Sequence, residues 1–240
     1  MKKRAATAAA STTDVSVARN TSFNLLWGSQ ILSQIGSNLI NFALIIRVFD
    51  LAAGTQFANI SVALLVLSFG LPALFLSAAA GIYVDHLNKR HVLLVVNFAR
   101  ALLALAFLFV DTNLWLVLIV SFAFSSATQF FAPAESAAIP MLVSKRQLLR
   151  ANSLFVFTLY TSFIVGYSAS APVIALFGSS GPYLVTSAML LLAGLLTLGL
   201  PDLRAQQPVK LRFNRLLHYT QSELIRNWKA ISTTHQLGFL

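Results

Sequence analysis

The sequence predicts an all-α membrane protein with six transmembrane helices and both termini in the cytoplasm. Three observations lead to this prediction. Hydrophobic residues make up 57% of the 240 positions and charged residues only 10%, which leaves too little polar surface for a water-soluble globule. The hydrophobic residues gather in six runs of membrane-spanning length. Nearly all of the 17 Lys and Arg residues lie on one side of these runs.

Each hydrophobic run approaches or exceeds the roughly 20 residues that a helix needs to cross the hydrocarbon core. A polar segment flanks the bundle at each end. Residues 1–22 are expected to form a cytoplasmic tail, and residues 201–240 a cytoplasmic linker with an amphipathic helix. The predicted spans are about 23–46, 58–83, 92–110, 114–132, 154–177 and 182–200.

The basic residues predict the orientation of these spans. The connections 48–57, 111–113 and 178–181 contain no Lys or Arg, whereas the tail, the other two connections and the final segment are rich in both. Because Lys and Arg are retained on the cytoplasmic side, both termini are expected to be cytoplasmic. The same distribution explains the net charge of +10 without a nucleic-acid partner, and the expected partner is the lipid bilayer.

Composition argues against metal, cofactor and enzyme chemistry. The chain has no cysteine, and its four histidines lie outside the hydrophobic runs or at their ends, without ligand spacing. We therefore expect no metal and no cofactor. Serines are common in the spans, but no His, Lys or acidic residue is predicted at the same depth, so an intramembrane enzyme is not expected.

Polar side chains at helical spacing mark the side of a span that meets protein or water. In the first run such residues follow steps of four, three and four: Gln30, Gln34, Ser37 and Asn41. With Gln129 of the fourth run, this stripe is a candidate wall of a transport cavity. The alternative is that these groups hold helices together. The sixth run has almost no polar residue and is expected to lie outermost.

Arg100 is the one formal charge deep in a predicted span, where it costs roughly 2.5–3.5 kcal/mol near the centre. Two explanations remain open. Arg100 contacts an anion or substrate in the transport cavity, or it has a structural role. In the structural case it bonds backbone carbonyls and amides such as those of Asn97 and Gln129, or it snorkels toward the membrane surface. No acid is predicted inside the hydrocarbon region, since Asp85 and Glu135 fall at the inner ends of spans. Proton coupling through an embedded acid is therefore not expected.

Glycine and proline occur at corresponding places in two runs. Gly70 and Pro72 interrupt the second run, and Gly166 and Pro172 interrupt the fifth. Breaks in corresponding members of two groups of three spans are expected of a transporter half built from two repeats.

Residues 81–90, GIYVDHLNKR, form a charged hinge between the second and third runs. Gly81 is expected to allow close packing against a neighbouring helix. Asp85 is expected to accept hydrogen bonds in the following turn, with Lys89 and Arg90 as its pairing partners.

This hinge resembles the signature loop of the major facilitator superfamily. The family pattern has Gly, three residues, Asp, a basic residue, any residue, Gly and two basic residues, and four positions match: Gly81, Asp85, Lys89 and Arg90. His86 and Asn88 depart from the pattern. Asn is the next-best residue for a left-handed turn, so Asn88 is expected to adopt one.

Residues 129–154 resemble the loop between the fourth and fifth helices in the drug-exporter branch of this family, which includes macrolide-efflux and enterobactin-exporter proteins. Pro133, Pro140 and Asn152 belong to the match. The resemblance covers about residues 20–240 and stops where the seventh helix of the family would begin.

This resemblance implies the N-terminal six-helix half of a major facilitator fold in a bacterial inner membrane. It implies secondary active efflux of a small amphipathic substrate, bound between two halves that alternate in access. A second six-helix half is the implied protein partner, and Asp85 is implied to bridge toward it. The alternative is a non-transporting remnant or interaction subunit.

Reporter tags test the predicted orientation. Tags inserted beside Lys89 and Lys145 should both report the cytoplasmic side, whereas a tag at Gly54 should report the opposite side, because only the first two lie in basic connections. Tags at Lys89 and Lys145 on opposite faces would contradict the six-span architecture.

Overall fold

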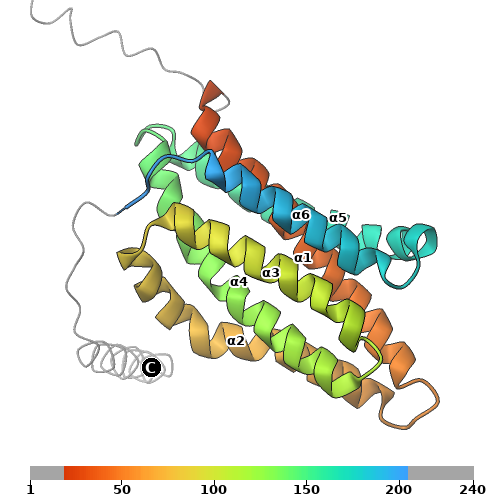
Figure 1. The fold of residues 1–240 in the computed structure, drawn as a ribbon. Helices are drawn as coiled ribbons and strands as arrows, with labels where there is room; N and C mark the ends of the chain where they lie inside the picture. Colours follow the sequence, from red (N-terminus) through yellow and green to blue (C-terminus); the bar gives the residue numbers. More distant parts are fainter. Residues whose placement is uncertain (1–18, 205–240) are drawn as a thin grey trace, which may run out of the picture. The chain divides into compact units, whose positions relative to one another are not determined.

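A computed structural model describes residues 19–204, which form six α-helices and no strand (Figure 1). All six helices are long and apolar enough to cross a membrane, so the predicted all-α class is confirmed. Residues 1–18 of the predicted tail and the predicted linker helix lie outside the described residues. The helices are α1 (Thr21–Leu51), α2 (Ala58–His86), α3 (Lys89–Val110), α4 (Leu114–Leu142), α5 (Leu148–Phe177) and α6 (Gly181–Leu198).

The helices form two three-helix repeats. α1 packs on α5 and α6, α4 packs on α2 and α3, and α3 packs on α6, between α6 and α4 in Figure 1. Exchanging α1 with α4, α2 with α5 and α3 with α6 leaves this set of pairs unchanged. The helix contacts therefore agree with a half-transporter built from two repeats.

α1 and α5 cross closely at Gly166. A Cβ atom at this position would lie 2.6 Å from the Cβ of Asn38 and 2.8 Å from the carbonyl oxygen of Ile35. One turn further along α5, the Ser170 hydroxyl donates to the carbonyl oxygen of Leu39 at 2.8 Å. Since lipid offers no hydrophobic drive for helices to associate, small residues that allow close approach stabilise such contacts.

α6 is not the outermost helix, contrary to the prediction. Half of its most apolar stretch is buried, against 17% in α2 and 22% in α5. The Thr186 hydroxyl donates to the carbonyl oxygen of Gly36 in α1 at 2.9 Å, and Gly194 lies against the ring of Phe98 in α3. The prediction failed because the few small and polar residues of α6 lie on the face that meets α1 and α3.

Three helices continue through internal prolines, which are Pro72 in α2, Pro133 and Pro140 in α4, and Pro172 in α5. The predicted loop of residues 129–154 is therefore mostly helical, and only a short connection separates Leu142 from Leu148. The fourth span is longer than predicted, and the acid that was placed beyond it lies within the helix.

A proline removes a backbone donor and is disfavoured in a helix interior. In a helix bundle, however, neighbouring side chains can satisfy the backbone groups that a proline disturbs. Such a contact occurs near Pro72, where the Ser125 hydroxyl of α4 donates to the carbonyl oxygen of Phe69 at 2.7 Å.

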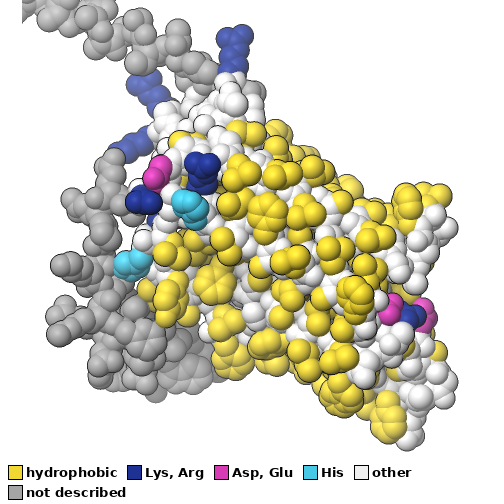
Figure 2. Space-filling view, viewed as in Figure 1, with side chains coloured by type: hydrophobic (Ala, Val, Ile, Leu, Met, Phe, Trp, Pro, Cys, Tyr) yellow, Lys and Arg dark blue, Asp and Glu magenta, His cyan; other side chains and the backbone are white. Residues whose placement is uncertain are grey.

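Apolar side chains cover the middle of the visible face, and charged side chains gather at its two ends (Figure 2). At the end opposite the hinge, Arg47 Nε lies 3.4 Å from a carboxylate oxygen of Asp111 and donates to its carbonyl oxygen at 3.1 Å. This ion pair joins α1 to the C-terminal end of α3. It explains why Arg47 lies apart from the other basic residues.

Substitutions at two helical glycines test the close crossing of α1 and α5. Gly166→Ala should lower the free energy of unfolding by about 1–3 kcal/mol, because the new methyl group overlaps Asn38 and the α1 backbone. Gly70→Ala is the matched control, since a Cβ there would meet nothing within 4 Å. Thermal unfolding in detergent compares the two variants, and equal shifts would contradict the close approach.

Candidate functional site

The hinge consists of the end of α2, a short connection and the start of α3. Gly81 lies inside α2, and a Cβ at this position would meet nothing within 4 Å. No described residue packs against Gly81, so its close packing against a neighbouring helix stays a prediction. A glycine permits close approach only where another helix crosses it, and that crossing occurs at Gly166 instead.

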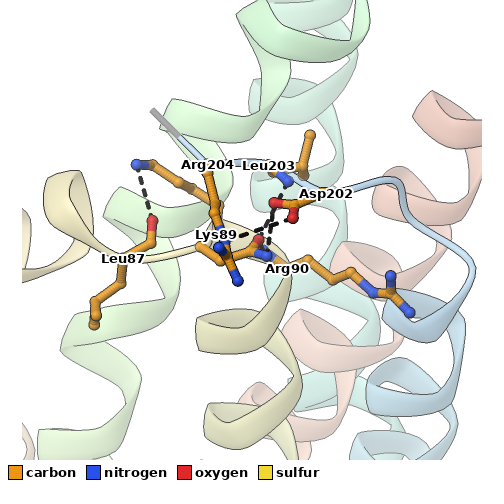
Figure 3. A network of polar contacts seen from close by, with 7 residues as sticks. Leu87, Lys89, Arg90, Asp202, Leu203 and Arg204 are labelled. Carbon is orange, nitrogen blue, oxygen red and sulfur yellow. Dashed lines mark hydrogen bonds and ion pairs between the residues drawn. The ribbon is translucent and has the colours of Figure 1, made fainter. Parts of the chain in front are cut away.

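The two basic hinge residues bind carbonyl groups at helix ends. Lys89 is buried, and its Nζ donates to the carbonyl oxygens of Asp85 and Leu87 at 2.8 and 3.1 Å; Figure 3 shows the bond to Leu87. Arg90 Nη2 donates to the carbonyl oxygen of Leu198 at 2.6 Å. Cations at helix C-termini satisfy carbonyls without intrahelical partners and complement the helix dipole. The start of α3 is thereby fastened to the ends of α2 and α6.

Asn88 binds the hinge to the segment that follows α6. Asp202 and Leu203 of this segment are labelled near Lys89 and Arg90 in Figure 3. Its Oδ1 accepts from the backbone N–H groups of Arg90 and Leu203 at 3.1 and 3.2 Å. Its Nδ2 donates to Asp202 Oδ1 at 2.9 Å, and the Lys89 N–H donates to the Leu203 carbonyl at 3.2 Å. We refer to the contacts of Asn88 with Asp202 and Leu203 as the Asn88 clasp.

The backbone of Asn88 differs from the expectation. Its φ of −70° and ψ of 114° are extended, so the predicted left-handed turn is wrong. Asn88 is instead the N-cap of α3, a position where a short side-chain acceptor is strongly preferred. Apolar contacts support the clasp, because Leu200 and Leu203 are each 2% exposed and belong to the same core cluster as Val84.

Asp85 does not make the contacts predicted for it. Its side chain is exposed, and no ion pair involves it within residues 19–204. Lys89 and Arg90 bond carbonyl groups instead, and Asn88 caps α3. Asp85 still belongs to α2, which ends at His86, so it precedes the turn that it was predicted to cap.

The polar stripe of α1 is divided between the interior and the surface of the bundle. Gln30 is buried, and its Nε2 donates to the carbonyl oxygen of Phe155 in α5 at 3.1 Å. Ser37 is also buried. Gln34 and Asn41 are partly exposed. The first two residues join α1 to other helices, and the cavity-lining role expected of Gln34 and Asn41 stays a prediction.

Arg100 is enclosed by α1 and α4 and is 1% exposed. Its Nη1 donates to the Ser33 hydroxyl at 2.9 Å, and its Nη2 donates to the Ser37 hydroxyl. The guanidinium carbon lies 5.2 and 5.4 Å from the ring centroids of Phe124 and Phe131. Hydroxyl acceptors and aromatic faces thus stabilise a charge that lipid would exclude.

The amides that were predicted to bind Arg100 have other partners. Asn97 Oδ1 accepts from the Ser33 hydroxyl at 3.2 Å, which extends the chain of hydrogen bonds from Arg100. Gln129 is partly exposed, and its Nε2 donates to the carbonyl oxygen of Ser125 at 3.2 Å. We call Arg100, with Ser33, Ser37 and Asn97, the Arg100 centre.

Glu135 is an acidic residue whose position the sequence did not predict correctly. It lies within α4, is 6% exposed, and has one carboxylate oxygen, Oε1, without a hydrogen-bond partner. Arg100 acts on it electrostatically, without a direct ion pair. The signal was its spacing, because Phe124, Phe131 and Glu135 share one helix face. Glu135 is therefore buried inside the bundle, within α4 rather than after its end.

The other residues of the fourth-to-fifth helix match lie away from these contacts. Pro133 is partly exposed and Pro140 is exposed on α4, while Asn152 is exposed on α5. Pro140 and Asn152 lie near the helix ends that the short connection joins, whereas Pro133 lies inside α4.

Two three-helix repeats with polar groups inside an apolar bundle define the class of multi-pass membrane proteins to which many secondary transporters belong. The sequence model of the Major Facilitator Superfamily matches residues 26–239. The chain belongs to the Major Facilitator Superfamily.

Curated relatives include an efflux protein. The chain is 30% identical over 132 residues to Macrolide efflux protein A of Streptococcus pyogenes, covering 53% of this chain and 32% of that protein. It is 24% identical over 172 residues to the uncharacterized MFS-type transporter YfiS of Bacillus subtilis, covering 71% and 41%. The matches thus span less than half the length of these relatives. No solved structure matches the chain.

Two N-cap asparagines provide a test of the Asn88 clasp. Asn88→Ala removes a helix cap and two contacts with the segment after α6, so it should lower stability by about 2–3 kcal/mol. Asn113→Ala removes only the cap bond to the Leu116 N–H and should cost about 1 kcal/mol. Thermal unfolding in detergent measures both. Equal losses would show that the clasp contributes no stability.

Proposed function

We propose that this chain forms one six-helix half of a secondary active transporter that exports a small amphipathic molecule from a bacterial cytoplasm. Alternating access between this half and a second half would move the substrate across the inner membrane. Family membership supports transport, and similarity to Macrolide efflux protein A supports export. The partly exposed polar residues proposed to line the path are Gln34, Asn41 and Gln129.

Incomplete burial of polar side chains on α1 carries this proposal. Gln34 and Asn41 are partly exposed on a helix of membrane-spanning composition, where contact with lipid would leave amide groups unsatisfied. Water or another protein surface has to cover them. A substrate path between two halves would supply both the water and the second protein surface.

The exposed helices α2 and α5 support a second half in that position. They are the least buried helices, and they occupy corresponding places in the two repeats. Their large exposed side chains include Leu74 and Phe75 on α2, and Phe157 and Ile164 on α5. We propose that the second half packs along both helices. Asp85, exposed at the end of α2, is then placed to bridge toward it.

A non-transporting interaction subunit is the second candidate function. The described six helices do not by themselves enclose a path between two halves, so a chain without a second half would not transport. Native mass measurement in mild detergent separates the two functions. A transporter contains a second six-helix half in the same particle, whereas an interaction subunit does not.

Asp85→Asn tests the proposed function in the complete assembly. Uptake of a radiolabelled macrolide into inside-out vesicles should fall about tenfold or more, because a lost charged bridge of about 1.4 kcal/mol changes an equilibrium tenfold. Membrane insertion should stay unchanged, since the Asp85 side chain is exposed.

The matched control is Asp50→Asn. Asp50 is also an exposed aspartate, but it lies near the C-terminal end of α1, at the opposite end of the bundle. Its substitution should leave uptake close to the wild-type rate. Equal uptake by the wild type and the Asp85 variant would show that Asp85 makes no bridge needed for transport. Absence of uptake by the wild-type assembly would reject macrolide transport.

A further inference from the structure

We propose that Glu135 is a proton-binding site inside the six-helix unit and that Arg100 is the charge that responds when the proton binds. Proton binding itself does not depend on the proposed function. Its use as the coupling step of transport rests on that function.

The carboxylate of Glu135 has the environment of a proton acceptor. It is 6% exposed within an apolar part of α4, among Phe131, Ala134 and Ala138 of the same core cluster. Its Oε1 is buried without a hydrogen-bond donor. An ionised carboxylate with an unsatisfied buried oxygen is costly, and a bound proton removes both the charge and part of the desolvation cost.

Arg100 is the cation that balances Glu135 among the groups on the helices that pack against α4. On α3, Lys89 is also buried, but its Nζ is occupied by two carbonyls at the end of α2. Arg90 donates to the carbonyl oxygen of Leu198, and His91 is exposed. On α2, Asp85 and His86 are exposed, as is Arg150 on α5. The buried polar residues of α1 are uncharged. The Arg100 guanidinium carbon lies 5.4 Å from the ring centroid of Phe131, which is one turn before Glu135 on the same face of α4.

The chemistry of the site favours a proton over a metal cation or a cationic substrate. A sodium or divalent ion needs several oxygen ligands, and residues 19–204 contain no group of three or more His, Cys, Asp or Glu that could hold a metal ion. A proton needs only one carboxylate oxygen, and it can enter without displacing packed side chains.

Proton binding changes one bond and one charge. One proton from water joins a carboxylate oxygen of Glu135, and no other covalent bond forms or breaks. The Glu135–Arg100 pair then changes from a net charge of zero to one positive charge. Arg100 keeps its bonds to Ser33 and Ser37 of α1 but loses the electrostatic attraction of α4. The proton therefore alters the balance of forces between α1, α3 and α4.

Carbodiimide labelling tests proton binding without requiring transport. Dicyclohexylcarbodiimide reacts with protonated carboxyl groups in apolar surroundings, and mass spectrometry locates the product. In the full chain in detergent, labelling of Glu135 should rise at least about tenfold as the pH falls from about 9 to about 5, since one pH unit changes a proton occupancy ratio tenfold. The exposed Asp50 and Asp202 are internal controls and should remain unlabelled.

Arg100→Gln tests whether the charge of Arg100 affects proton binding at Glu135. Removing the cation favours the neutral acid, so labelling of Glu135 should persist to higher pH than in the wild type. If this variant does not fold, the pH dependence of Glu135 labelling in the wild-type protein alone decides whether the proton site exists. Absence of Glu135 labelling at every pH in folded wild-type protein would overturn the proton site. Protection by sodium at constant pH would overturn it in favour of a sodium site.

Glu135→Gln tests the coupling role in the complete assembly. Macrolide uptake into vesicles should lose its dependence on a pH gradient while exchange of bound substrate continues. Retained dependence would overturn the coupling role. If the wild-type assembly transports nothing, the proposed function fails, and the labelling result still decides whether Glu135 binds a proton.

Discussion

Backbone polar groups inside a bilayer must find partners within the protein, and this constraint organises the ends and contacts of the six helices. Lys89 and Arg90 bind carbonyls at the ends of α2 and α6, where no intrahelical donor remains. Hydroxyl groups bind carbonyls where helices cross, as Ser170 and Thr186 do on α1. The few polar residues of this apolar chain therefore determine which helices meet and how the hinge is built.

The number and class of the helices were predictable because both follow from local properties. The length of an apolar run decides whether it can span the hydrocarbon core, and Lys and Arg concentrate in the cytoplasmic connections. The length of α4 was not predictable in this way. Whether Pro133 ends a helix depends on how neighbouring elements satisfy the backbone, and the sequence does not state which helices are neighbours. Because the fourth span was predicted to end at residue 132, Glu135 was placed after the helix rather than within it.

The candidate site shows a similar limit. The positions of the hinge residues were recognisable from spacing, but their partners were not. Lys89 was expected to pair with the carboxylate of Asp85. Its Nζ donates instead to the carbonyl oxygen of Asp85, because the carbonyl groups at the end of α2 face the start of α3. Gly81 and Gly166 are indistinguishable as glycines in helices. Only the crossing of α1 and α5 makes the second a packing residue and leaves the first open.

The close packing of the six-helix bundle determines whether a bound ligand or a change of charge can act between its helices. Gly166 holds α5 against the backbone of α1, and the Arg100 centre joins α1 to α3, so a bulky ligand cannot enter between these helices without breaking several contacts. A change of charge needs no such opening. Rocking of whole halves in alternating access requires each half to remain rigid while its preferred position changes. A buried acid beside a buried arginine meets both requirements, because it alters electrostatic energy while leaving the helix packing in place.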